Sequence, residues 1–199
     1  GMGGAFCHSR VGLRTEYLSD EWFELINRCA AKGKRDGMEM WLYDEDRYPS
    51  GTAGGMVTEN RELGIHYLRL NKAQGEFKFS EEVISAFILE FKEGKIARKE
   101  RIFADAAVPA GCEIWYFTSE IMNSGSFYNG NPYADNANPE TVERFIELTH
   151  KRYVEKCGDY IKDGTIKGIF TDEPHHGGVM NGFAISNENG THLVPLPKD

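Results

Sequence analysis

Residues 38–47 read MEMWLYDEDR, an apolar strand-like run that passes directly into charged residues. Residues 166–174 read IKGIFTDEP, and this run also ends in adjacent carboxylates. In an α/β protein the carboxyl ends of parallel strands meet at one edge, so the side chains that follow them converge. A single Asp-Glu pair after a strand is more often a solvated loop or a helix cap. Two such runs together predict a carboxylate site.

The composition is typical of a globular domain and excludes several partners. The chain has 199 residues, 40% hydrophobic and 27% charged, with a formal net charge of −8. The negative charge argues against nucleic acid and anionic membrane surfaces, because both are bound chiefly by Lys and Arg. No run approaches the roughly 20 apolar residues of a membrane span. We expect a soluble protein with no nucleic-acid or membrane partner, cytoplasmic or exported within a longer parent.

Helical patterns separate the strand-like runs. Ser19 has the features of an N-cap, and apolar residues then recur at helical spacing until Gly37. Asn138, followed by Pro139, predicts the start of a second helix that ends at Gly158 or a little beyond. The order of strand, helix and strand up to residue 43 predicts a right-handed βαβ unit with parallel strands.

A different pattern occupies residues 63–105, where apolar and polar residues alternate. Glu93-Gly94 between two such stretches predicts a tight turn, so we expect an antiparallel β insertion here. The apolar run at residues 113–119 is then expected to return to the parallel sheet and to end in Glu120.

These elements give about four parallel strands and two firm helices. A full (β/α)₈ barrel needs eight strands and typically about 250 residues. We therefore predict an α/β fold, a partial TIM-type (β/α) barrel. It forms a single domain over residues 1–199 that contains the insertion at 63–105.

The predicted carboxyl ends of the strands collect the candidate functional residues. Carboxylates at such a position serve proton transfer and oxocarbenium stabilisation in sugar chemistry, and aromatic rings can stack on a sugar. The candidates are His8, Arg10, Tyr43, Asp44, Glu45, Asp46, Arg47, Glu120, Asp172, Glu173 and His175.

Metal binding is a rival use of the same residues. His175 and His176 follow Asp172 and Glu173 and could ligate a divalent ion, although adjacent histidines seldom share one metal. A metal-dependent hydrolase therefore stays an alternative. A structural calcium ion held by the acids of residues 44–46 is a second one, without support from an EF-hand pattern. Otherwise we expect no cofactor and no bound metal.

Four segments together resemble a known family. WLYDEDRYPSGTAGG (41–55), HSRVGLRTEYLSDEW (8–22), NPETVERFIELTHKRYVEKCGD (138–159) and GIFTDEP (168–174) resemble the (β/α)₈ catalytic domain of bacterial glycoside hydrolases, the α-L-rhamnosidase-like group in particular. The resemblance implies a carbohydrate substrate and places Glu173 at the end of strand four as the catalytic acid. It also implies a sugar subsite lined by Asp44, Glu45 and Arg47, with His8 and Arg10 at the first strand.

One departure limits what the resemblance implies. A full barrel of this kind takes its second catalytic carboxylate from a later strand, so this polypeptide alone is expected to be inactive if that acid lies beyond Asp199. A non-catalytic carbohydrate-binding or structural fragment is therefore an alternative to a glycoside hydrolase. An incomplete barrel would also leave strand edges uncovered, which predicts self-association.

Overall fold

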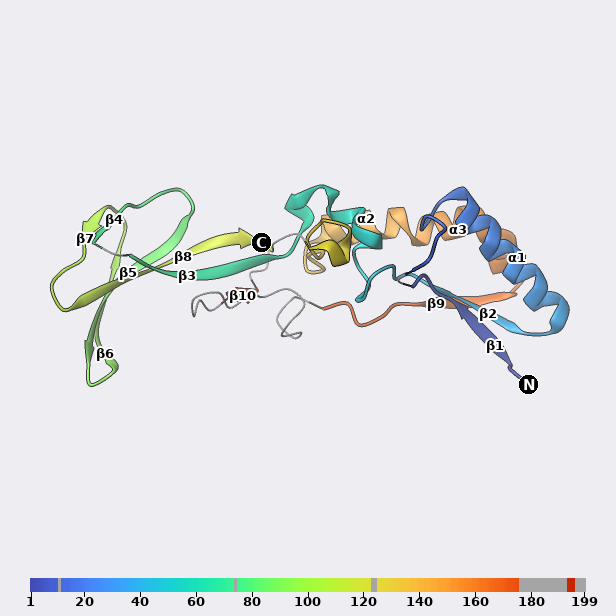
Figure 1. Ribbon diagram of the computed structural model, residues 1–199, viewed down its shortest axis with the longest axis horizontal. Coiled ribbons are helices and arrows are strands. Elements are labelled where there is room, and N and C mark those ends of the chain that lie inside the picture. Colours follow the sequence, from blue (N-terminus) through green and yellow to red (C-terminus); the bar gives the residue numbers. More distant parts are fainter. Residues whose placement is uncertain (11, 74, 123–124, 176–192, 196–199) are drawn as a thin grey trace. The chain divides into compact units, whose positions relative to one another are not determined.

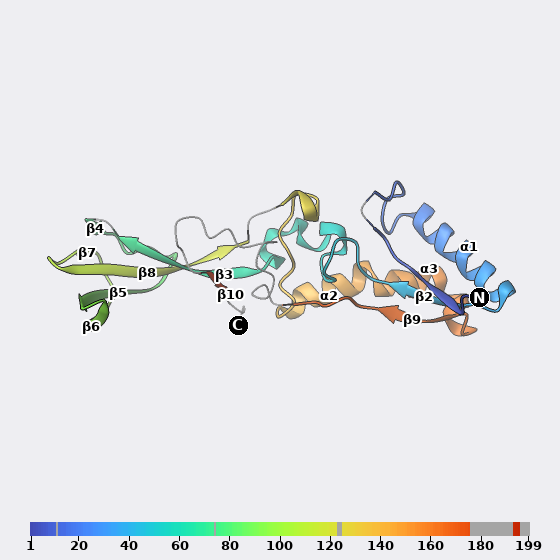
Figure 2. The same cartoon turned by 60° about the horizontal axis from the view of Figure 1, so that its bottom comes forward.

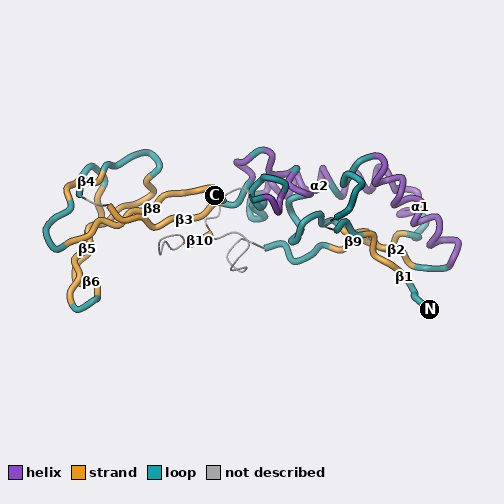
Figure 3. Tube along the Cα trace, viewed as in Figure 1, coloured by secondary structure: helices purple, strands orange, loops and turns teal. Residues whose placement is uncertain are grey.

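The computed structural model of this chain describes residues 1–10, 12–73, 75–122, 125–175 and 193–195. The described residues divide into two compact units (Figure 1). The parallel unit holds those of residues 1–65 and 125–175, and the antiparallel unit holds those of 66–122 and 193–195. The described α-helices belong to the parallel unit, whereas strands and loops build the antiparallel unit (Figure 3).

A three-stranded parallel sheet forms the centre of the parallel unit. Its strands are β1 (Gly4–Cys7), β2 (Glu39–Tyr43) and β9 (Ile166–Phe170), in the order β1-β2-β9. Helix α1 (Asp20–Asp36) connects β1 to β2, which pair in parallel. The predicted βαβ unit is therefore confirmed.

The ends of α1 lie where the sequence predicts them. The Ser19 hydroxyl accepts a hydrogen bond from the backbone N–H of Trp22 at 3.2 Å. Gly37 ends the helix in the left-handed conformation, with φ of 68°. Trp22, Phe23 and Ile26 on one face of the helix are buried in the core. Capping and an apolar stripe thus fix both the length and the orientation of α1.

The second predicted helix is interrupted. Asn138 caps α2 (Pro139–Leu148) as expected, but a new helix, α3 (His150–Lys162), begins after Thr149. The buried Thr149 hydroxyl donates to the Phe145 carbonyl at 2.6 Å, and Thr149 has φ of −111° and ψ of −78°. Such a side-chain bond to the preceding turn bends helices. The break matters because His150, directly after it, reaches the acids described below.

The two faces of the parallel sheet differ. Helices α1 and α3 cover one face, where Met40, Leu42 and Ile166 are buried (Figures 1 and 2). The other face carries aromatic rings in mutual contact. We call this set the aromatic face: Phe6, Trp41, Tyr43 and Phe170. Phe6 is 54% exposed and Phe170 is 44% exposed, so the described residues leave part of this face open to solvent.

The antiparallel unit is built on one sheet with the strand order β10-β3-β8-β5-β6. The strands are β3 (His66–Ala73), β5 (Val83–Lys92), β6 (Lys95–Ile102), β8 (Cys112–Ile121) and β10 (Leu193–Pro195). Strands β5 and β6 form the predicted hairpin around Glu93-Gly94, and both turn residues have positive φ. Phe77 and Ile114 are buried in a separate small core.

Short elements complete the described fold. Strands β4 (Glu76–Phe77) and β7 (Ala106–Ala107) pair with each other in an antiparallel arrangement. Single 3₁₀ turns are η1 (Ala53–Gly55), η2 (Val57–Glu59), η3 (Arg61–Leu63) and η4 (Ser126–Tyr128). Among the described residues, none of the helices combines the length and the apolar character needed to cross a lipid bilayer.

The predicted partial (β/α) barrel is wrong. The run at residues 113–119 lies within β8, which pairs antiparallel with β3 and with β5 instead of joining the parallel sheet. Within the described residues the parallel sheet therefore has three strands, and no alternating β/α pattern continues beyond it. The physical reason is that an apolar run suits any central strand, while β3 and β5 supply antiparallel partners close in sequence.

Candidate functional site

The two acid-bearing runs meet at the carboxyl edge of the parallel sheet. The Asp44 N–H donates to the Phe170 carbonyl at 3.1 Å, which aligns the ends of β2 and β9. Beyond them, the Ser50 N–H donates to the Asp172 carbonyl and the Asp172 N–H donates to the Ser50 hydroxyl, each at 2.9 Å. We call the side chains gathered here the acidic edge: His8, Tyr43, Asp44, Glu45, Asp46, Asp172 and Glu173.

Asp44 is enclosed by the protein. Its side chain is 0% exposed, and Oδ1 accepts a hydrogen bond from the Ser50 hydroxyl at 2.6 Å. Oδ2 accepts from the Thr171 hydroxyl at 2.6 Å and lies 2.8 Å from His150 Nε2. Both oxygens of the Asp44 carboxylate are therefore engaged by side chains of the protein, which come from three different segments. This geometry gives Asp44 a role in organising the edge.

Asp46 and Arg47 form a second internal cluster. Asp46 accepts from the Ser9 hydroxyl, and Arg47 Nη1 lies 3.2 and 3.3 Å from its two oxygens. Gly54 lies against the same carboxylate, because a Cβ added there would sit 2.7 Å from Asp46 Oδ2. Gly54 also has φ of 68°, which side chains rarely adopt. The glycine-rich loop after β2 thus shapes the surroundings of Asp46.

Among the acids of the edge, Glu45 has a carboxyl group whose pKa is strongly raised. It is 3% exposed, and its Oε1 lies 3.0 Å from His8 Nε2. The Oε2 atom is buried and faces no donor among the described residues. Burial, followed by the charge of Asp172 and a hydrogen bond shared with it, raises the pKa of Glu45 to about 7. A proton on Glu45 therefore stabilises both carboxyl groups.

Tyr43 and His8 support this carboxyl pair. Their rings stack, with centroids 3.6 Å apart and planes 7° apart, and the Tyr43 hydroxyl donates to Asp172 at 2.5 Å. Burial, and then the positive charge of the exposed Arg10, lowers the pKa of His8. The pKa of Tyr43 is raised well above its usual value, by burial and then by Asp172.

Glu173 stands apart from the buried acids. It is exposed, and its carboxylate accepts a hydrogen bond from the Tyr48 hydroxyl, which raises the pKa of Tyr48 to about 12. Its φ of 38° lies in the left-handed region, which costs energy for a residue with a side chain. His175 follows at the same edge, stacked on Tyr133 with ring centroids 5.0 Å apart.

The structure does not place every predicted residue at this edge. Glu120 belongs to the antiparallel unit, where it pairs with Arg69 at 2.6 Å. Glu120 belongs to that unit because β8 pairs antiparallel with β3 and β5. His176, the other half of the predicted histidine pair, lies outside the described residues.

Several contributing residues were missed by the sequence analysis. Ser9, Tyr48, Ser50, His150 and Thr171 all contact the acids. They lie within the segments quoted above, but they are not among the candidate residues drawn from those segments. Ser50 gave the best available signal, because it lies in the PSG turn immediately after the acids. His150 gave none, since its contact depends on the break after α2.

Cavities also lie away from the carboxyl pair of Glu45 and Asp172. One of about 270 Å³ touches Asp46 and Arg47 and is also lined by Arg14, Glu16 and Asn129. A larger one of about 580 Å³ belongs to the antiparallel unit. In the described part of the chain, no three His, Cys, Asp or Glu side chains group in a way that could hold a metal ion.

Comparisons with known proteins complete this description. A scan against protein-family models, a search of curated proteins and a search of solved structures each found no match. The functional proposal therefore depends on the geometry of the acidic edge and on the sequence resemblance described above.

Proposed function

We propose that this protein is a glycoside hydrolase in which Glu45 donates a proton to the leaving-group oxygen. The supporting observation is the Glu45 carboxyl, buried between His8 and Asp172 with a pKa of about 7. A general acid must hold its proton near neutral pH, and a neighbouring carboxylate that stays ionised is the usual partner in this chemistry.

The other groups of the edge have separate roles in this proposal. Burial, and then the charge of Asp172, keeps the proton on Glu45. The Tyr43 hydroxyl donates a hydrogen bond to Asp172 and so holds that carboxylate in place. Glu173 is the second carboxylate, because it is exposed and can face a substrate. The sequence resemblance gave the acid role to Glu173, and we assign it to Glu45 because burial raises the pKa of Glu45.

The aromatic face lies beside these carboxyl groups on the same sheet. Tyr43 belongs to both the aromatic face and the acidic edge. Its ring packs on Phe170 with centroids 4.9 Å apart, and its hydroxyl donates a hydrogen bond to Asp172. Partly exposed rings can stack on the apolar side of a pyranose. We therefore propose a carbohydrate substrate, with L-rhamnosides as the first candidates from the resemblance.

The test is hydrolysis of a panel of aryl glycosides, including aryl α-L-rhamnosides with leaving groups of different basicity. Glu45→Gln should reduce kcat for a phenyl glycoside by about 10²–10⁴-fold. The loss should be much smaller for a dinitrophenyl glycoside, whose leaving group needs little protonation. Glu173→Gln should slow both substrates alike. Glu59→Gln, on an exposed turn, is the matched control.

Each other result has a defined meaning. If Glu45→Gln reduces kcat equally for both leaving groups, Glu45 is not the general acid. Calorimetric binding of a sugar without turnover by the wild type would favour the non-catalytic carbohydrate-binding alternative. Turnover that is lost to a chelator and restored by one defined ion would favour a metal-dependent hydrolase.

A further inference from the structure

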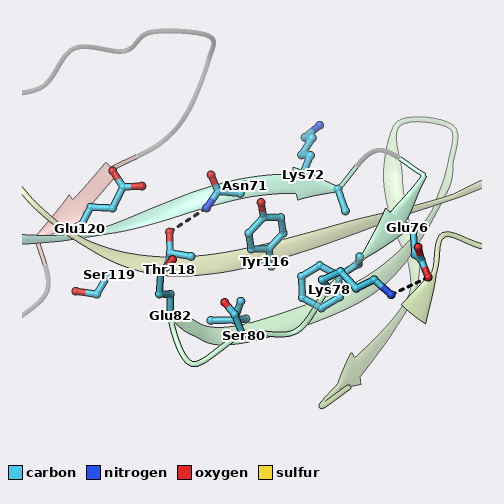
Figure 4. Close-up of a pocket in the computed structure, with 13 residues that line it drawn as sticks. Asn71, Lys72, Glu76, Lys78, Ser80, Glu82, Tyr116, Thr118, Ser119 and Glu120 are labelled. Carbon is cyan, nitrogen blue, oxygen red and sulfur yellow. Dashed lines mark hydrogen bonds and ion pairs between the residues drawn. The ribbon is translucent and has the colours of Figure 1, made fainter. Parts of the chain in front are cut away.

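The cavity of about 580 Å³ in the antiparallel unit is separate from the acidic edge. It lies over the sheet between β3 and β8 and is bordered by the segment from β4 to the start of β5 (Figure 4). Its volume falls within the ~300–1,000 Å³ typical of small-molecule sites. The groups that line it decide which ligand it can recognise.

Aromatic and apolar groups form one part of the lining. Tyr116 lies in the middle of the cavity (Figure 4), and its ring packs on Phe77 with centroids 5.1 Å apart. Phe77 and Val83 are 3% and 8% exposed, so they support the Tyr116 ring from the small core. An aromatic ring held in this way offers a stacking surface at low entropic cost.

Neutral polar groups lie beside this ring. Asn71 and Tyr116 occupy directly paired positions of β3 and β8, and the Asn71 amide donates to the Thr118 hydroxyl at 3.0 Å (Figure 4). This bond leaves the Asn71 carbonyl oxygen and the Thr118 O–H for a ligand. Ser80 adds another hydroxyl from the bordering segment.

The charged residues of the lining already have partners. Lys78 pairs with Glu76 at 2.9 Å, Lys72 pairs with Glu113 at 3.1 Å, and Glu120 pairs with Arg69. Glu82, the remaining charged lining residue, is exposed to solvent. A charged ligand would therefore have to compete with existing ion pairs, whereas a neutral one would not.

We propose that this cavity is a binding site for a neutral saccharide, which stacks on Tyr116 and hydrogen-bonds to Asn71 and Thr118. A purely apolar ligand would leave these polar groups unpaired, which costs free energy. The site does not depend on the glycosidase proposal, because none of its lining residues belongs to the acidic edge. It would hold a glycan on the antiparallel unit whether or not the acidic edge cleaves one.

The experiment is a titration of the ¹⁵N-labelled 199-residue protein, followed by amide NMR. The probes are L-rhamnose, D-glucose, D-galactose, D-mannose and cellobiose, with D-glucuronate and D-glucosamine as charged comparators. At least one neutral sugar should give saturable shifts at the amides of residues 71, 116 and 118. Shifts at the acidic edge report on the glycosidase proposal separately.

Variants then test the individual contacts. Asn71→Ala should weaken binding about three- to tenfold, the loss expected for one neutral hydrogen bond. Tyr116→Leu should weaken it about tenfold, whereas Tyr116→Phe keeps the ring and should bind within about threefold of wild type. Ser85→Ala, on β5 outside the cavity lining, is the matched control and should bind as wild type does.

Three outcomes would overturn the proposal. The first is that no neutral sugar gives saturable shifts in the antiparallel unit. The second is that a charged comparator binds more tightly than any neutral sugar. The third is that Asn71→Ala and Tyr116→Leu both leave the affinity unchanged. The amide spectrum of each variant shows directly whether it is folded, so a loss of binding is not confused with unfolding.

Discussion

His8 and Glu45, 37 positions apart in the sequence, meet at the acidic edge with His8 Nε2 3.0 Å from Glu45 Oε1. Burial moves their pKa values in opposite directions, because it disfavours the charged form of each. The contact is therefore a hydrogen bond between uncharged groups wherever His8 has lost its proton and Glu45 still holds its own, just below the Glu45 pKa of about 7. A full ion pair would make Glu45 a poor proton donor.

The first prediction is a pH-dependent stability that Glu45 controls. Its pKa is about 7 in the folded protein against 4.5 as the ordinary value, so folding takes up a proton between these limits. The free energy of unfolding should then fall as the pH rises from about 4.5 to about 7. Glu45→Gln should match wild type at low pH and exceed its stability at pH 8 by on the order of 2–3 kcal/mol.

Urea unfolding at several pH values measures this difference. His8 contributes with the opposite sign, because its pKa is lowered in the folded protein. Wild type and Glu45→Gln both keep His8, so the difference between them reports on Glu45 together with its contact to His8. Glu59→Gln serves as the exposed control. If wild type and Glu45→Gln lose stability in parallel over this range, Glu45 does not hold the proton.

The second prediction concerns Asp44. Asp44→Ala removes the acceptor shared by Ser50, Thr171 and His150 in a fully buried position. The loss should be about 3–5 kcal/mol, as for one partner removed from a buried polar network. Denaturant unfolding measures it. Asp36→Asn, which breaks an exposed contact with Lys32, should leave the midpoint nearly unchanged, and an equal effect of both variants would contradict the buried network.

Local elements of the fold could be predicted from the sequence, but the pairing of one strand could not. Ser19, Gly37 and Asn138 gave the helix ends correctly, because capping depends on residues close in sequence. The partners of the run at 113–119 depend on distant strands. Its apolar pattern fits a parallel and an antiparallel centre equally well, so the barrel prediction failed there.

The same limit applies to the site. The acids after β2 and β9 meet because both strands lie in one parallel sheet, which the pattern of residues 38–47 and 166–174 indicated. Burial of Glu45 beside Asp172 is a property of packing, and no pattern of residues near position 45 indicates that the proton is held there. His150 reached Asp44 only through the helix break at Thr149.

The third prediction is self-association through the aromatic face, in competition with a sugar that stacks on the same rings. Phe6 and Phe170 are 54% and 44% exposed on the same side of the parallel sheet, and adjoining exposed rings favour burial against a second surface. Sedimentation velocity should show concentration-dependent association that Phe170→Ser weakens. Val154→Ser, at an exposed position of α3, should not weaken it. A monomer at every concentration would contradict the prediction.

The fourth prediction separates proton chemistry from metal binding. The carboxylates of Asp44 and Asp46 already accept hydrogen bonds from Ser50, Thr171 and Ser9, so a calcium ion would have to displace these donors. Thermal unfolding should therefore give the same midpoint with calcium and with a chelator. A midpoint that rises with calcium concentration would support the calcium alternative instead.

The reciprocal hydrogen bonds between Ser50 and Asp172 make the geometry of one loop set part of the acid strength of Glu45, beyond the larger part that burial sets. They fix the end of β9 to the loop after β2, and so they fix the like charge that weakens Glu45 as an acid. A movement of this loop that carried Asp172 away would lower the pKa of Glu45 and release its proton.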